Sequence, residues 1–390
     1  MSYPILLGAL LSLGPLAAHA QGQVSGRVLD RQTRQPVPYA SVVVAGTTQG
    51  TTSNADGEFV LRVNQLPAKV LAFSLGYGRD SVLVSQANPA LTLALAPAPV
   101  ALPAVEGSSY AAELLARAYH ELQRTAAHLQ YGQAFYRQVT RLGDDPTEVQ
   151  EMVWDVKATS AGLAGFSYAQ GRYAAKKALV HFRNFPNYSL AASFFAPGID
   201  SAAYKAVVSP NATRDYTLRL KGLTQSGSHP VAEVAFASKA DARQGSVFIA
   251  TDTYQVLHFL VHMPVPTTSN NPLFRFREST IAFEFDLAPQ PDAARLNYLK
   301  ITYSGYIVRP LRADMRMQVN SFTYFYNPQP SPTVPAYSNV SAPLDLATIK
   351  QKPYDAAFWR DNPVVKRTPL EEEVLRSFEN QRAFGTMLTK

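Results

Sequence analysis

Short apolar runs separated by turn signals fill the chain from residue 23 to residue 95. Within residues 58–63, Phe59, Leu61 and Val63 fall on one face and Val60 on the other, as expected for a strand with one buried side. The preceding residues 54–57 combine side chains that bond their own backbone with a glycine, which predicts a tight hairpin turn. The pattern predicts a small β-sandwich with strands at residues 24–29, 41–44, 58–63, 70–75, 80–84 and 91–95.

A proline-rich stretch and a helix follow the predicted sandwich. Prolines at close intervals in residues 96–103 are typical of a semi-rigid linker. Ser109 can cap a helix that ends near residue 128, and this amphipathic helix opens the second domain. The apolar positions with helical spacing are Ala111, Leu114, Leu115, Ala118 and Leu122.

The rest of the chain is mostly β in pattern. Ten short strand-like stretches predict one large antiparallel sheet or half-barrel. Together with the sandwich, they make the expected fold class mostly β, with helices flanking the larger sheet. The ten stretches are residues 151–158, 165–170, 177–182, 216–222, 231–237, 246–250, 255–263, 275–285, 298–307 and 316–325.

The C-terminal part predicts a loop, an aromatic anchor and a helix. Five prolines in residues 327–343 predict an extended strap across the surface. The aromatic residues of 354–359 predict an anchor that docks the C-terminal segment. Thr368 as N-cap, Pro369 in the first turn and Glu371 three residues after the cap predict a helix, with Leu370, Val374 and Phe378 along its apolar stripe.

The N-terminal residues predict export. Residues 5–17 are apolar apart from Ser12, glycine and proline, and Ala18-His19-Ala20 has the small-x-small pattern of a signal-peptidase site. Residues 1–4 contain no Lys or Arg, so the n-region is weak, and a retained anchor is the alternative although the run is short for a membrane span. We expect a signal peptide at residues 1–20, a sandwich at 21–95, a linker at 96–107 and a β-rich domain at 108–390.

The amino-acid composition excludes several kinds of functional site and partner. The chain contains no Cys, which excludes disulfides, thiolate metal sites, cysteine nucleophiles and a lipid-bearing cysteine. The net charge of +7 is spread over scattered basic residues without a nucleic-acid motif, so we expect no nucleic-acid partner and at most a weak attraction to acidic lipids.

The first domain resembles the carboxypeptidase-regulatory-like domain family, a transthyretin-like sandwich of seven strands. The matching residues, in order, are Gly26 to Asp30, Pro36 to Val44, Gly46-Thr47, Gly50-Thr51, Asp56 to Phe59 and Gly76-Tyr77. In metallocarboxypeptidases this module accompanies a separate catalytic domain with an H-x-x-E zinc pair, and the chain has no H-x-x-E. The resemblance therefore implies a scaffold and not a peptidase.

The same module also precedes the plug and barrel of TonB-dependent outer-membrane receptors. A plugged barrel of that type needs on the order of 500 residues, whereas fewer than about 290 remain after the linker. We therefore expect the chain not to be a receptor of that type. Asp30, Asp56 and Glu58 could be proposed as calcium ligands, but at turn and strand positions we expect them to form turns or face solvent.

The second domain has two weaker resemblances. Ala134 to Arg137 and Tyr354 to Trp359 are similar to segments of uncharacterised exported bacterial envelope proteins. Residues 245–256 resemble a hairpin in the half-barrels of periplasmic lipoprotein carriers, where a concave apolar sheet holds acyl chains. These resemblances imply an envelope protein or a lipid-like ligand as partner.

Motif searches identify no catalytic, cofactor-binding or metal-binding residue. The chain has no G-x-S-x-G, S-x-x-K, P-loop or H-E-x-x-H motif. His258 and His262 share a strand face but have no evident third ligand, so we interpret them as half-buried histidines. Glu284 and Asp286 also share a face, and we interpret them as charges on a solvated surface. A site assembled from distant residues would escape this search.

Three functional hypotheses remain open at this point. The leading hypothesis is a non-catalytic exported protein of the periplasm or outer membrane that binds another envelope protein or an apolar ligand. The second is a small outer-membrane β-barrel formed by the second domain. The third is an envelope hydrolase with a dispersed site, which requires His120, His181 or His229 to lie within hydrogen-bonding reach of both a Ser and a carboxylate.

Overall fold

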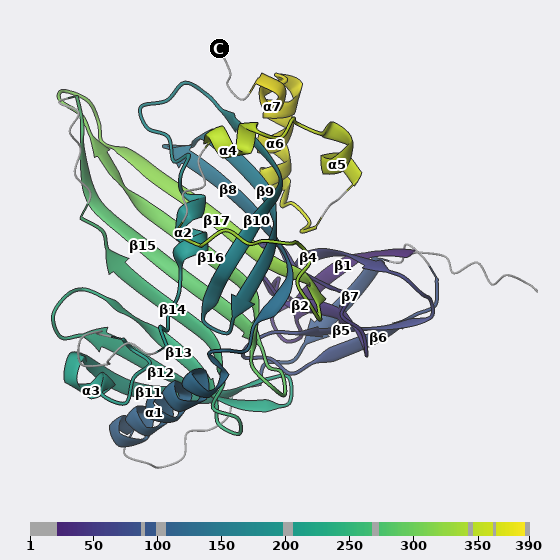
Figure 1. The fold of residues 1–390 in the computed structure, drawn as a ribbon, viewed down its shortest axis with the longest axis vertical. Coiled ribbons are helices and arrows are strands. Elements are labelled where there is room, and N and C mark those ends of the chain that lie inside the picture. Colours follow the sequence, from purple (N-terminus) through teal and green to yellow (C-terminus); the bar gives the residue numbers. More distant parts are fainter. Residues whose placement is uncertain are drawn as a thin grey trace, which may run out of the picture.

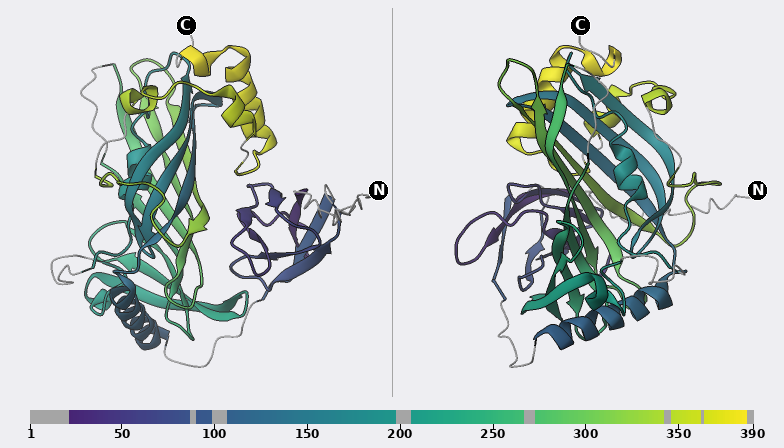
Figure 2. Two further views of the ribbon diagram at one scale, coloured as in Figure 1. Left: turned by 45° about the vertical axis from the view of Figure 1, so that its right-hand side comes forward. Right: turned by 90° about the vertical axis from the view of Figure 1, so that its left-hand side faces the viewer.

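The computed structural model contains two β-rich domains that lie side by side (Figure 1, Figure 2). It describes residues 22–86, 90–98, 107–197, 206–266, 273–341, 346–361 and 364–386. The predicted signal peptide at residues 1–20 lies outside the described residues, as do residues 99–106 of the predicted linker. Residues 96–98 belong to the sandwich, because Tyr77 pairs with Pro97 in a β-bridge.

The N-terminal domain is the predicted sandwich of seven strands. One sheet has the order β4-β1-β7 and the other the order β3-β2-β5-β6. The apolar faces of the two sheets enclose a core in which Val28, Phe59 and Leu93 are fully buried. The strands are β1 (Gly22–Asp30), β2 (Ser41–Val44), β3 (Gly50–Thr52), β4 (Glu58–Val63), β5 (Ala68–Phe73), β6 (Asp80–Val84) and β7 (Ala90–Leu95).

The turn before β4 has the predicted chemistry but not the predicted role. Asn54 Oδ1 accepts hydrogen bonds from the backbone N–H groups of Asp56 and Glu58, both at 2.9 Å, and Gly57 has a φ of +72°. However, β3 pairs with β2 and β4 pairs with β1. The turn therefore joins the two sheets, and the prediction of a hairpin was wrong because turn chemistry alone does not determine which strands pair.

The second domain is built on an antiparallel sheet of ten strands that is not closed into a barrel. Its order is β10-β9-β8-β17-β16-β15-β14-β13-β12-β11, with β10 and β11 at the edges. The strands are β8 (Gln130–Leu142), β9 (Asp145–Thr159), β10 (Gly162–Ala175), β11 (Tyr216–Ser226), β12 (His229–Ser238), β13 (Gln244–Ala250), β14 (Val256–Pro264), β15 (Arg275–Ala288), β16 (Arg295–Val308) and β17 (Met315–Gln329).

Two strand predictions differ from the structure. Residues 177–182 form a loop and not a strand, while β8 was not predicted. The loop is held in place by Glu148, which is fully buried and accepts a hydrogen bond from Phe182 N at 2.8 Å. In β8, Gln138 and Thr140 are buried polar residues, which obscure the alternation of apolar and polar positions that marks a strand.

One face of the large sheet, called the inner face here, is covered by helices and loops of the same domain. Helix α1 (Gly107–Thr125) contacts β11 and β13, and α2 (Pro186–Ala191) contacts both β10 and β16, so the sheet curls around them (Figure 1). The predicted apolar positions of α1 are all buried. Phe194 stacks on Phe259 in the same core. A short helix, α3 (Ala212–Asp215), contacts α1 and β11.

The opposite, outer face carries the sandwich and the C-terminal segment from residue 356 onward (Figure 2). Residues 346–350 instead pack at β10, where Ile349 joins the inner-face core. Four helices belong to the described part of the chain after residue 345: α4 (Leu346–Lys350), α5 (Ala356–Asp361), α6 (Pro369–Asn380) and α7 (Ala383–Thr386). The predicted capping box of α6 is present, since Thr368 Oγ1 accepts from Glu371 N and Glu371 Oε2 accepts from Thr368 N. Val374 and Phe378 are buried as predicted, whereas Leu370 is 53% exposed.

The predicted strap after β17 is also present. Ser338 forms a β-bridge with Phe166 at the edge strand β10, and Thr333 Oγ1 donates to Asp155 on β9. This part of the loop therefore covers part of the β10 edge, which would otherwise present unpaired backbone groups.

Candidate functional site: the groove between the domains

Tyr39 is the main aromatic contact between the sandwich and the outer face of the sheet. Its ring stacks on Phe322 with 5.0 Å between centroids and contacts Tyr298 at 5.5 Å, while Lys300 Nζ lies 5.1 Å from the ring centre. Tyr39 has a φ of 55°, an uncommon conformation for a residue with a Cβ. Burial raises the pKa of the Tyr39 hydroxyl to about 12. The ring thus acts as an anchor between the domains.

The segment that precedes α6 connects both domains. Its backbone accepts hydrogen bonds from the sandwich, where Thr51 Oγ1 donates to Val364 O at 3.3 Å and Asn54 Nδ2 donates to Arg367 O at 3.2 Å. Lys366 Nζ lies 3.0 Å from Glu58 of the sandwich. From the sheet side, Arg137 Nη2 donates to Val365 O at 3.3 Å. Residues 364–367, called the clasp here, therefore lie between the two domains.

A buried ionic cluster on the outer face fixes the clasp and α6. Glu151 on β9, 1% exposed, accepts from Arg137 Nε on β8 and from Arg172 Nε on β10, both at 2.7 Å. The same arginines reach α6, at 3.2 Å to Glu371 and 3.0 Å to Glu379. Burial alone would raise the pKa of Glu151, but the charges of Arg172 and Arg137 outweigh this effect and lower the pKa to about 2.

The aromatic anchor predicted at residues 354–359 belongs to this cluster. The guanidinium of Arg172 lies 4.8 Å from the ring centre of Trp359 and 4.6 Å from that of Phe384. Trp359 is 5% exposed. The C-terminal segment is therefore docked by cation–π contacts as well as by ion pairs.

A series of cavities runs along the interface between the domains. Their volumes are about 190, 80, 470 and 800 Å³. Neighbouring cavities share lining residues: the first two share Ser41, the second and third share Thr48 and Tyr326, and the third and fourth share Val364. We call this series the interdomain groove. It has the sandwich on one side, the sheet on the other and the clasp at one end.

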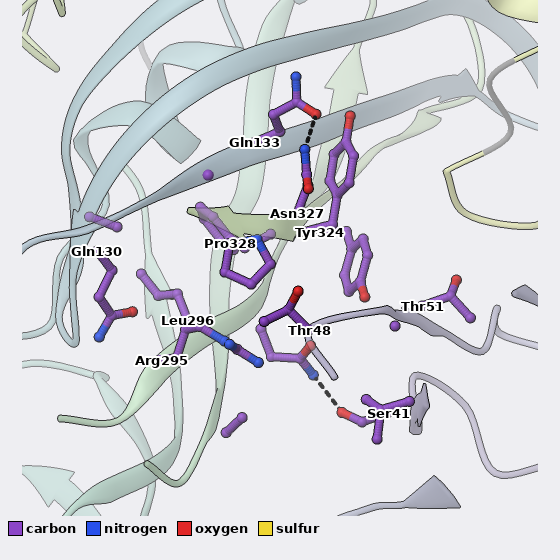
Figure 3. A pocket seen from close by; sticks show the side chains of 18 of the residues that line it. Ser41, Thr48, Thr51, Gln130, Gln133, Arg295, Leu296, Tyr324, Asn327 and Pro328 are labelled. Atoms are coloured by element: carbon purple, nitrogen blue, oxygen red, sulfur yellow. Dashed lines mark hydrogen bonds between the residues drawn. The ribbon is translucent and has the colours of Figure 1, made fainter. Parts of the chain in front are cut away.

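The second cavity, shown in Figure 3, contains a half-buried arginine at its wall. Arg295 at the start of β16 is the single charged residue among the described residues that line it. In the described part of the chain, Arg295 has neither a hydrogen-bond acceptor nor a carboxylate partner. Burial lowers the pKa of its guanidinium, and the nearby Tyr324 opposes that effect. By contrast, the largest cavity is lined by arginines that already hold glutamates.

Two of the residues considered from the sequence, His258 and Asp286, line the cavity at the other end of the groove. Antiparallel pairing of β14 with β15 places His258 opposite Asp286, with His258 Nδ1 3.4 Å from Asp286 Oδ1. Glu284 accepts from Lys300 at 3.3 Å. The side chains of Glu284 and Asp286 are only 23% and 19% exposed, so they are not on an open solvated face. His262 lies farther along β14, opposite Ala282.

Two of the three sandwich carboxylates considered from the sequence, Asp30 and Glu58, have structural partners. Asp30 Oδ1 accepts from the backbone N–H groups of Gln32 and Thr33, as expected for a turn former. Glu58 is paired with Arg27 and with Lys366 of the clasp. Within the described ranges, no group of three or more His, Asp or Glu side chains is arranged to hold a metal ion.

The histidine arrangement required by the hydrolase hypothesis is not found in the described part of the chain. His229 Nδ1 lies 2.8 Å from Asp252 but has no Ser hydroxyl bonded to it. His181 Nδ1 is buried without a hydrogen-bond partner among these residues, and His120 packs its ring on Tyr119. No helix in the described ranges is both long enough and apolar enough to cross a membrane.

Fold and site together define a two-domain β protein, in which a seven-stranded sandwich is docked on the outer face of an open ten-stranded sheet. Residues 24–105 match the model of the CarboxypepD_reg-like domain family, which agrees with the resemblance seen in the sequence. The match covers the sandwich and leaves the large sheet outside it.

The chain was also compared with solved structures and with curated proteins. A solved structure of a protein of unknown function from Bacteroides fragilis NCTC 9343 is similar, with 12% identity over 80% of this chain and 99% of that chain, and a TM-score of 0.17. Comparison with curated proteins found no match.

Sequence reasoning did not single out Arg295 or the ionic cluster. The predicted strand began at residue 298, so Arg295 fell outside it, although β16 begins at Arg295. Arg137 was noted only as part of a short motif. The sequence does contain one signal for Arg295: it is a charged residue between two apolar residues, Ala294 and Leu296. Both neighbours are buried in the structure.

Proposed function

We propose that the chain is a non-catalytic binding protein of the cell envelope, and that the interdomain groove is where it holds its ligand or a segment of a partner protein. The observation that carries this proposal is the continuous series of cavities between the domains, lined by tyrosines, amides and one unpaired arginine. Sites of this kind occur preferentially at domain interfaces.

The inner, concave face of the large sheet is filled by side chains of the same domain. This supports the interdomain groove, and not the concave face, as the binding site. The hairpin that resembles lipoprotein carriers is formed by β13 and β14, and its inner-face residues Val247 and Ile249 are fully buried in the domain's own core. The lining of the groove combines apolar surface with tyrosine hydroxyls, amides and the guanidinium of Arg295. The groove therefore fits a ligand that carries polar groups.

Export and envelope location are part of this proposal. They rest on the apolar run and the small-x-small pattern in residues 1–20. Fractionation of the producing cells, with an antibody against the second domain, measures this part directly. A protein that stays in the cytosolic fraction at its full precursor mass would refute it.

In-cell photo-crosslinking tests the position of the binding site. Thr48 is exposed, lines two adjoining cavities of the groove and makes no side-chain hydrogen bond in the described structure, so a photoreactive amino acid fits there. Thr92 on β7 is likewise exposed and lines none of these cavities, which makes it the matched control. We expect a discrete adduct from position 48 alone. Equal adducts from both positions, or none from position 48, would contradict the proposal.

A further inference from the structure

Arg295 is a cation without a counter-charge in the described structure. It is half-buried, and the cavity that it lines contains no Asp or Glu among its described lining residues. Transfer of a charge away from water is costly unless an opposite charge or hydrogen-bond acceptors replace the lost solvation. Arg137 and Arg172 meet this requirement through Glu151, whereas Arg295 does not.

The groups around Arg295 can act as hydrogen-bond donors to an anion. Figure 3 shows its side chain among the lining residues, with the guanidinium directed to the side of the cavity where Thr48 lies. Tyr324 contributes a buried phenol. Gln133 Nε2 already donates to Asp155 at 3.5 Å and Asn327 Nδ2 to Gln133 Oε1 at 3.3 Å, so each of these two amides has one N–H left for an anion. Asn297, by contrast, already uses its amide on Ser41 at 3.0 Å and on Asp286 at 2.7 Å.

The size of the cavity limits what can sit beside Arg295. Its volume of about 80 Å³ is several times the ~10–15 Å³ that one water molecule needs, so a small headgroup fits and a whole drug-sized ligand does not. The adjoining cavity of about 470 Å³ shares Thr48, Tyr326 and Asn327 and leads toward Val364 of the clasp. A ligand can thus place one end at Arg295 and its body along the groove.

We infer that Arg295 binds an oxyanion, a carboxylate or a phosphate group at one end of the ligand that occupies the interdomain groove. This inference rests on the proposed function and adds the chemical class of the ligand. A guanidinium presents two parallel N–H groups that match the two oxygens of either anion, which explains the choice of Arg at this position.

Calorimetric titration of the full mature chain at constant ionic strength tests the assignment. The probes are inorganic phosphate and acetate, with acetamide as the neutral analogue of acetate. We expect saturable binding of at least one anion and none of acetamide. Arg295→Gln should weaken the binding at least tenfold, the range expected for loss of a charge-assisted hydrogen bond. Arg295→Lys should retain part of it, because the charge remains but the paired donors do not.

Arg219→Gln is the matched control, since Arg219 on β11 is exposed and has no partner in the described structure. It should bind like the wild type. Thermal unfolding of each variant checks that it folds. Absence of anion binding by the wild type, or equal binding by Arg295→Gln, would overturn the inference. Which of the two anions binds more tightly distinguishes a phosphate-bearing ligand from a carboxylate-bearing one.

The inference and the proposed function can fail separately. If the protein co-purifies with a ligand that Arg295→Gln retains as well as the wild type, groove binding stands and the oxyanion assignment falls. If a groove blocked at Thr48 still retains the ligand, the proposed site itself falls.

Discussion

Replacement of Glu151 by Gln removes the charge at the centre of the buried ionic cluster and keeps the shape of the side chain. At neutral pH the carboxylate faces both Arg137 and Arg172. Its pKa of about 2, against 4.5 for an unperturbed carboxyl, corresponds to about 3 kcal/mol of stability at pH 7. Breaking a buried ion pair from one side costs about 3–5 kcal/mol. We therefore expect Glu151→Gln to lower the free energy of unfolding by about 3 kcal/mol.

The pH dependence of the stability difference between wild type and Glu151→Gln tests the same prediction in a second, independent way. A carboxyl whose pKa is lowered by folding contributes its full stability above the unfolded value and loses it as the pH falls toward the folded value. The gap between wild type and Glu151→Gln should therefore be largest at pH 7, smaller by about 1 kcal/mol at pH 4 and smaller by about 2 kcal/mol at pH 3.

Denaturant unfolding followed by tryptophan fluorescence measures this gap. The chain has two tryptophans: Trp359 lies beside Arg172 of the cluster, and Trp154 is buried on the inner face of β9. Glu373→Gln on the exposed side of α6 is the matched control and should change the free energy of unfolding by less than about 0.5 kcal/mol. A Glu151→Gln variant as stable as that control, or a gap that widens toward pH 3, would refute the reasoning.

Two further predictions concern the contacts that hold the C-terminal helix and the sandwich. Thr368→Ala should lower stability by about 1 kcal/mol through loss of the N-cap of α6, whereas Thr368→Ser should retain it, as measured by urea unfolding. Tyr39→Ala should increase the radius of gyration in small-angle scattering because the stack on Phe322 is lost, while Tyr39→Phe should not. Since burial raises the pKa of Tyr39 to about 12, its contribution should be present below pH 10 and be lost between pH 10 and pH 12, and Tyr39→Phe should lack this loss.

Local signals were sufficient to predict many of the elements. The alternation in residues 58–63 predicted β4, the helical spacing from Ala111 to Leu122 predicted α1, and the cap at Thr368 predicted the start of α6. Each of these depends on neighbours within a few residues in sequence. The structure confirmed them because tertiary contacts did not override them.

The site could not be predicted in the same way, because its residues come from distant parts of the chain. Pairing of β9 with β8 and β10 brings Glu151 to Arg137 and Arg172. The same two arginines reach glutamates of α6 only because the clasp crosses between the domains. Strand register and domain docking determine these contacts, and neither is encoded in residue spacing. The polar residues Gln138 and Glu148 also made a buried part of the sheet look irregular in sequence.

Native mass spectrometry of the mature protein tests the central claim most directly, with the wild type, Thr48→Trp and Thr92→Trp purified from the envelope fraction and compared with their denatured masses. Thr48→Trp places a large side chain in the groove without removing a buried contact, and Thr92→Trp is the matched control outside it. We predict a retained small-molecule or peptide adduct on the wild type and on Thr92→Trp, and its loss from Thr48→Trp. An adduct retained equally by all three proteins, or none on the wild type, would contradict the interdomain groove as the binding site.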